Sequence, residues 1–160
     1  MKRVLLFLSI VVFSIFVGSQ ITEGFLLVPY WKMLSPAEFY EYYASFGPSI
    51  GKFYTVLTII AALIPISLSA YCFFYKSQGL KYAIASTFFA FLFVGLFYVY
   101  FKGVNQQFYN AVFNAGQLKD ALNTWEYLHW LRVFFEILSL FFLILAINVS
   151  SLKEDSNKTI

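Results

Sequence analysis

Residues 128–149, LHWLRVFFEILSLFFLILAINV, are apolar over the length that a helix needs to cross a bilayer. At about 1.5 Å per residue, roughly 20 residues span the ~30 Å hydrocarbon core. Each such stretch must be helical, because only then are its backbone hydrogen bonds made without water. Three similar stretches precede it, at about residues 4–28, 53–75 and 82–101. The sequence predicts an all-α membrane four-helix bundle, with one domain at residues 1–152 and a disordered polar tail at 153–160.

Composition supports a membrane location and excludes other classes. The 160 residues are 61% hydrophobic, 22% aromatic and only 12% charged, against about 25% charged in a typical soluble domain. The lipid bilayer is therefore the expected partner. The net charge of +3 is small and the basic residues are scattered, so no nucleic acid partner is expected. Cys72 is the only cysteine, which excludes an intrachain disulfide and a CxxC redox pair.

The start of the chain has two interpretations. Lys2 and Arg3 followed by an apolar run to Gly18 imitate a secretory signal peptide. Apolar residues resume at 25–28, which makes the segment longer than a signal peptide's apolar core. We therefore expect a retained transmembrane helix, with cleavage as the alternative.

The basic residues predict that both ends of the chain are cytoplasmic. The two tails and the short loop at residues 76–81 carry Lys and Arg at a higher density than the longer loops on the opposite side. Those on one side are Lys2, Arg3, Lys76, Lys81, Lys153 and Lys158, and those in the longer loops opposite are Lys32, Lys52, Lys102 and Lys119. At the outer interface we expect an aromatic belt of Tyr30, Trp31, Trp125, Tyr127 and Trp130.

The first outer loop contains a helix start. Ser35 has the character of an N-cap, Pro36 suits the first helical position, and Glu38 completes a capping box. The aromatic residues that follow predict a short interfacial helix, ended by Gly47-Pro48.

Polar residues form one stripe on the fourth predicted helix. Trp125, His129, Arg132 and Glu136 are spaced four, three and four residues apart, which places them on a single helical face. A charge at mid-bilayer costs roughly 2.5–3.5 kcal/mol even on the most permissive scale. Each charged residue here therefore needs a partner or a function.

The first predicted helix offers partners for this stripe. Gln20 and Glu23 lie near its outer end, at the depth expected for Arg132 if the two helices are antiparallel. Glu136, one turn beyond Arg132 on the same helix, is the competing partner. The sequence leaves open which carboxylate pairs with Arg132.

Two interpretations of these charges remain. In the first, Glu23, Arg132 and Glu136 form a buried ion-pair cluster that only fixes helix register. In the second, the outer half of the bundle holds a polar pocket, with His129 as proton acceptor or donor and Arg132 stabilising an anion. A single histidine makes a zinc or iron site unfavourable, so no metal is expected.

The chain resembles the anthrone-oxygenase-like family of small four-helix membrane proteins from about Gly18 to Leu143. The resemblance is carried by Gly24-Phe25 with Pro29, by Asn105 and Asn110, and by Trp125, His129 and Arg132. Most members of this family are bacterial, which implies a multi-pass protein of the bacterial cytoplasmic membrane. Fungal members oxidise an anthrone to an anthraquinone with dioxygen and without a bound cofactor.

The resemblance implies oxidation of a small hydrophobic aromatic or quinone-type compound, with no cofactor. The candidate catalytic residues are His129, Arg132 and Glu23, and the candidate substrate-binding residues are Asn105, Asn110, Gln20, Trp125 and Glu136. A non-enzymatic accessory subunit or small-ligand binder is the alternative. A transporter of four helices would have to oligomerise, and the oligomeric state stays open.

Overall fold

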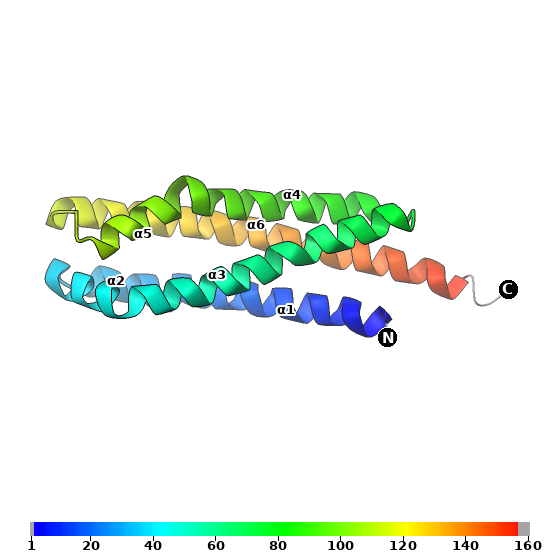
Figure 1. Cartoon of the computed structure of the whole chain (residues 1–160), viewed down its shortest axis with the longest axis horizontal. Helices are drawn as coiled ribbons and strands as arrows, with labels where there is room; N and C mark the ends of the chain where they lie inside the picture. The colour runs from blue at the N-terminus through cyan, green and yellow to red at the C-terminus, as the bar shows by residue number, and fades with distance from the viewer. Residues whose placement is uncertain (1, 157–160) are drawn as a thin grey trace.

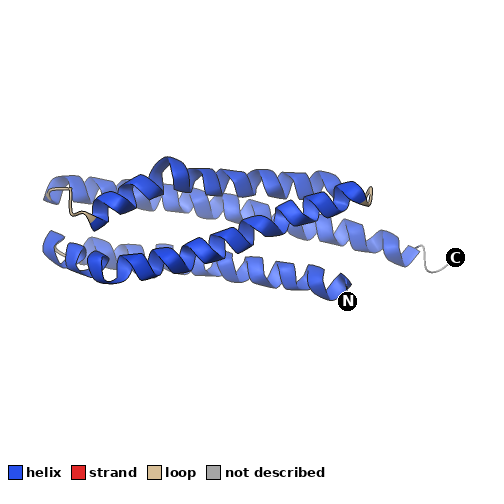
Figure 2. Cartoon of the chain, in the orientation of Figure 1, coloured by secondary structure: helices blue, strands red, loops and turns tan. Residues whose placement is uncertain are grey.

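The computed structural model describes residues 2–156, and every regular element within them is a helix (Figure 2). Two short segments, η1 and η2, are π-helical, with backbone hydrogen bonds between residues five apart. The elements are α1 (Lys2–Thr22), η1 (Glu23–Leu27), α2 (Val28–Met33), α3 (Pro36–Phe74), α4 (Leu80–Leu96), η2 (Phe97–Phe101), α5 (Lys102–Tyr109) and α6 (Ala115–Ser156).

Four continuous helical segments are long and apolar enough to cross a membrane: Val4–Met33, Pro36–Phe74, Leu80–Tyr109 and Ala115–Ser150. The predicted four-helix membrane bundle is therefore confirmed, and the chain is a multi-pass membrane protein. Each segment is longer than the predicted stretch, and most of the added residues lie at the end of the bundle that holds α2 and α5 (Figure 1). The apolar pattern identifies only the residues expected in the hydrocarbon core, whereas each helix continues beyond them into more polar sequence.

The chain runs up and down through the bundle (Figure 1). The start of α1, the α3–α4 turn and the end of α6 lie at one end, which we call the inner end. The opposite end, called the outer end, holds α2, the start of α3, α5 and the start of α6. The two described ends of the chain therefore lie on the same side, as expected.

The predicted interfacial helix begins where expected but does not end at Gly47-Pro48. The Ser35 hydroxyl accepts from the Glu38 backbone N–H, and the Glu38 carboxylate accepts from the Ser35 backbone N–H at 2.8 Å. The helix then continues as α3 to Phe74. Gly47 does not adopt the positive φ of a helix C-cap, and a proline removes only one backbone donor from a membrane helix.

The predicted disordered tail overlaps the end of α6. Residues 153–156 continue the helix of α6. The rest of that prediction, residues 157–160, lies outside the described residues.

The predicted outer aromatic belt is also partly wrong. Trp31 and Trp125 are each only 3% exposed, so they lie inside the bundle. Tyr30 and Tyr127 are exposed, at 43% and 73%. The sequence marks all of these residues as interfacial by type and depth, but it does not show which way each ring points.

Two apolar clusters hold the bundle together. The inner cluster includes Phe13, Phe93 and Leu143, and the outer cluster includes Phe39 and Phe108. Small residues bring α4 and α6 together, and Ser86 and Ser139 each donate to the other's backbone carbonyl, at 2.7 and 2.9 Å. The polar residues of α1 and α6 occupy the level between these two clusters.

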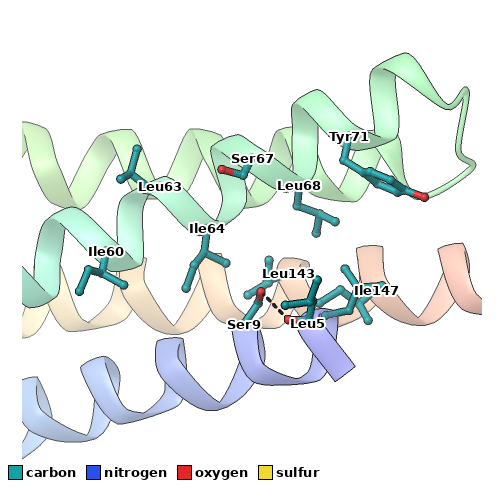
Figure 3. Close-up of a pocket in the computed structure, with 11 residues that line it drawn as sticks. Leu5, Ser9, Ile60, Leu63, Ile64, Ser67, Leu68, Tyr71, Leu143 and Ile147 are labelled. Atoms are coloured by element: carbon teal, nitrogen blue, oxygen red, sulfur yellow. Dashed lines mark hydrogen bonds between the residues drawn. The ribbon is translucent and has the colours of Figure 1, made fainter. Parts of the chain in front are cut away.

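The inner half of the bundle carries an apolar groove of about 410 Å³ between α1, α3 and α6 (Figure 3). Leu5 and Ser9 line it from α1, Ile60 and Ile64 from α3, and Leu143 from α6. The groove has no charged residue among its lining residues. It therefore offers mainly apolar packing, and its polar side-chain groups are the hydroxyls of Ser9, Ser67 and Tyr71.

Candidate binding site in the outer half of the bundle

Each of the two π-helical segments supplies one contact to Arg132. Glu23 begins η1, and its Oε2 lies 3.3 Å from Nη2 of Arg132. Phe101 ends η2, and its ring centroid lies 4.7 Å from the guanidinium carbon. Such segments are rare and occur frequently at functional sites, because the extra residue changes which side chains face inward. Arg132 is therefore held between an acidic and an aromatic contact.

Arg132 is the centre of a buried polar cluster. The two N–H groups of its Nη2 are shared among three acceptors: Gln20 Oε1, Glu23 Oε2 and Nδ1 of His129, the last at 3.0 Å. Its Nε lies 3.7 Å from Glu136 Oε1. The question that the sequence left open is thus answered: Arg132 hydrogen-bonds Glu23 across the helices and makes a longer ion pair with Glu136.

His129 uses both ring nitrogens inside this cluster. Its Nε2 lies 2.9 Å from the backbone carbonyl of Gln20, which can only accept, so Nε2 carries the proton. Its Nδ1 then accepts from Arg132, which can only donate. The imidazole is fully buried and stacks on Trp125 with ring centroids 5.0 Å apart. His129 therefore positions Arg132 and has no free nitrogen for a substrate.

Glycine at position 24 allows α1 and α6 to approach at this level. A Cβ on Gly24 would lie 2.8 Å from Trp130 and 3.1 Å from the His129 ring. These distances are shorter than an ordinary van der Waals contact, so a larger residue would push His129 out of place.

Gly24→Ala is expected to lower stability by about 1–3 kcal/mol, the usual cost of overpacking a core. Gly18→Ala on the same helix is the matched control, because nothing lies within 4 Å of a Cβ there. Unfolding in mixed detergent micelles, followed by circular dichroism, measures both. Equal stability of the two variants would show that the α1–α6 contact is not tight.

A cavity of about 270 Å³ adjoins this cluster and is lined mainly by α3. Glu23 and Arg132 lie on its wall together with the aromatic rings of Trp31 and Trp125. Helix α3 adds Tyr43, Gly47, Ile50, Gly51, Tyr54, Thr55, Thr58, Ile59, Ala62 and Leu63, and the remaining lining residues are Val94, Phe97, Tyr98 and Asn105. The site is thus mainly apolar and aromatic, with a charged group at one place.

The structure brings some predicted site residues to the cavity and leaves others away from it. Asn105 lines it and accepts from Trp125 Nε1 at 3.0 Å. Gln20, His129 and Glu136 contact Arg132 but are not lining residues. Asn110 is exposed at the end of α5 and bonds Gln106, so it lies outside the site.

Several buried polar atoms of the cluster lack a hydrogen-bond partner among residues 2–156. They are Gln20 Nε2, Arg132 Nε and both carboxylate oxygens of Glu136. Buried polar groups are normally satisfied, and in a membrane an unsatisfied one is especially costly. A bound water or ligand would be needed to satisfy these groups.

The α3 side of the cavity was not identified from the sequence, although a signal was present. Small and polar residues recur at Gly47, Gly51, Thr55, Thr58 and Ala62, spaced three or four apart on one helical face. The predicted break at Gly47-Pro48 concealed this face, because it divided α3 into two parts.

No family model, curated protein or solved structure matches the chain. The site must therefore be interpreted from its own geometry. Within residues 2–156, no three His, Cys, Asp or Glu side chains are grouped so that they could hold a metal ion.

Proposed function

We propose that the outer half of the bundle binds a small hydrophobic compound of aromatic or quinone type, through an oxygen atom of that compound and the guanidinium of Arg132. The proposed setting is the bacterial cytoplasmic membrane with both chain ends in the cytoplasm. The observation that carries the proposal is the buried guanidinium of Arg132, beside the Glu23 carboxylate, on the wall of a cavity whose other lining residues are mainly aromatic and aliphatic.

Arg132 has donors to spare for such a ligand. Its three hydrogen bonds to Gln20, Glu23 and His129 all use Nη2. Nη1 therefore keeps two N–H groups that no residue in 2–156 accepts. A hydrogen bond from a charged donor is stronger than a neutral one, and it is stronger still away from water. An oxygen atom of the ligand would accept a hydrogen bond from these N–H groups.

The cavity is open to the lipid rather than to the aqueous phase alone. Ile59, Leu63 and Tyr98 line it and are themselves more than half exposed, at 54%, 54% and 65%. These residues lie in the membrane-crossing segments, so the surface around them faces hydrocarbon. A hydrophobic ligand could therefore enter from the bilayer.

Thr58→Phe is expected to abolish binding of the probe menadione, because the larger ring fills the cavity without touching the Arg132 ion pairs. Val56→Phe is the matched control, since Val56 is 51% exposed on the same helix and does not line the cavity. Equilibrium dialysis against protein in lipid nanodiscs measures binding, with protein-free nanodiscs subtracted. Unchanged binding in Thr58→Phe would contradict the proposed site.

Cofactor-independent oxidation is a second candidate, and one observation favours it: the Glu23 carboxylate lies on the cavity wall beside Arg132. A substrate C–H proton would pass to Glu23 rather than to His129, whose nitrogens are both occupied. Arg132 would stabilise the resulting carbanion, which would add dioxygen and take back a proton to form a hydroperoxide, and loss of water from the hydroperoxide would leave a ketone. Dioxygen uptake with an anthrone distinguishes this reaction from binding alone.

A further inference from the structure

The Glu23 carboxylate offers the cavity an acceptor that the protein leaves unused. Every hydrogen bond and ion pair of this carboxylate with the described residues uses Oε2, which lies 3.3 Å from Nη2 of Arg132 and 3.8 Å from Nδ1 of His129. Within residues 2–156, Oε1 has no hydrogen-bond partner and, unlike both carboxylate oxygens of Glu136, is not fully enclosed by protein. Since Glu23 lines the cavity, a ligand there can reach Oε1.

A free donor lies beside this free acceptor. Nη1 of Arg132 keeps its two N–H groups and, unlike Nε of the same side chain, is not fully enclosed. Nη1 shares its carbon with Nη2, as Oε1 of Glu23 shares its carbon with Oε2. Because Nη2 and Oε2 are in direct contact, Nη1 and Oε1 belong to adjoining parts of the cavity wall. The wall therefore presents a donor and an acceptor next to each other.

The charges of the cluster favour a neutral ligand. Arg132 faces two carboxylates, with Glu23 at 3.3 Å and Glu136 at 3.7 Å. His129 is neutral, because its Nδ1 accepts from Arg132. An anionic ligand would bring a further negative charge to a guanidinium whose charge is already balanced, in a site away from water. A neutral group that both accepts and donates a hydrogen bond fits the pair of Arg132 and Glu23 better.

We propose that the ligand presents a neutral hydroxyl group, as a phenol or a hydroquinone does, which accepts from Arg132 Nη1 and donates to Glu23 Oε1. A hydroxyl has one donor and two acceptor lone pairs, so one group can make both bonds. A carbonyl oxygen can only accept, and it would leave Glu23 without a donor. The inference rests on the proposed function and adds that the reduced form of a quinone-type ring binds more tightly than the quinone form.

Two probes with the same number of heavy atoms test the hydroxyl without any substitution in the protein. 1-Naphthol carries a hydroxyl on a fused ring, whereas 1-tetralone carries a carbonyl at the same position. We expect the protein in nanodiscs to bind 1-naphthol about 10- to 100-fold more tightly, the factor that corresponds to one hydrogen bond to a charged group. Equilibrium dialysis measures both, with each dissociation constant referred to the probe concentration in the lipid of protein-free nanodiscs. Equal affinities would overturn the hydroxyl requirement and leave the proposed site standing.

A substitution assigns the preference to Glu23. Glu23→Gln replaces the charged acceptor by a neutral one and is expected to lower the preference for 1-naphthol about 3- to 10-fold. The ratio of the two dissociation constants does not depend on how much of the variant is folded, because both probes bind the same sample. Glu126→Gln is the matched control, since Glu126 is partly exposed and does not line the cavity.

The outcomes separate this inference from the proposed function. A preference that is unchanged in Glu23→Gln, or that falls equally in Glu126→Gln, would overturn the hydrogen bond assigned to Glu23 while the cavity still binds both probes. Failure of both probes to bind the unsubstituted protein would instead overturn the proposed function.

Discussion

Arg132→Ala is expected to destabilise the bundle by about 3–5 kcal/mol and to abolish menadione binding. The loss of the guanidinium leaves Glu23, which is 5% exposed, without its charge partner, and an unpaired buried charge is far more costly than a missing contact. Glu136, which is fully buried, loses its ion pair as well. Unfolding in mixed detergent micelles measures the change.

The matched control is an ion pair at the surface of the same bundle. Lys32 and Glu126 are 2.6 Å apart with side chains 33% and 30% exposed. Lys32→Ala is expected to cost less than about 1 kcal/mol, because exposed pairs are solvated and screened. The double variant Arg132→Ala with Glu23→Ala should recover part of the loss, since the two side chains interact directly. Equal effects of Lys32→Ala and Arg132→Ala would show that the Arg132 cluster is not buried as described.

His129→Phe is expected to destabilise the protein by about 2–4 kcal/mol while keeping most of the ring volume. The substitution removes two buried hydrogen bonds, the one from His129 Nε2 to the Gln20 carbonyl, worth about 0.5–1.5 kcal/mol, and the one from charged Arg132 to His129 Nδ1, worth about 1.5–3 kcal/mol. Menadione binding should weaken, because Arg132 loses the group that orients it. Tyr127→Phe on the same helix is the control, since Tyr127 is 73% exposed. Unfolding and dialysis measurements on the same nanodisc preparations check both expectations.

This prediction separates a positioning role for His129 from a catalytic one. A histidine that served as general base should be replaceable without loss of folded protein, and only turnover would suffer. A fully stable His129→Phe would therefore contradict the hydrogen bonds assigned to both ring nitrogens.

Much of the fold followed from the sequence because the bilayer restricts the alternatives. A long apolar stretch must be helical in lipid, so four stretches define four helices and place both chain ends on one side. The spacing of His129, Arg132 and Glu136 then fixes one helical face, and antiparallel packing brings Glu23 to the same depth. The meeting of Glu23 with Arg132 could be expected on these grounds.

The rest depends on packing between helices, which no local pattern records. The π-helical segments that present Glu23 and Phe101 depart from the 3.6-residue period on which sequence interpretation relies. Trp31 has the residue type and depth of an interfacial anchor, and only the arrangement of its neighbours shows that it is buried. Pro48 is a helix breaker in water but lies within a continuous membrane helix.

Native mass spectrometry of the protein extracted with its surrounding lipid tests the central claim most directly. We predict a copurifying small molecule with a quinone-type ring in the unsubstituted protein and in Val56→Phe, and its absence from a folded Thr58→Phe variant. A cavity that is empty in all three proteins, or that holds the same molecule after Thr58→Phe, would contradict the claim that this cavity binds such a compound at Arg132.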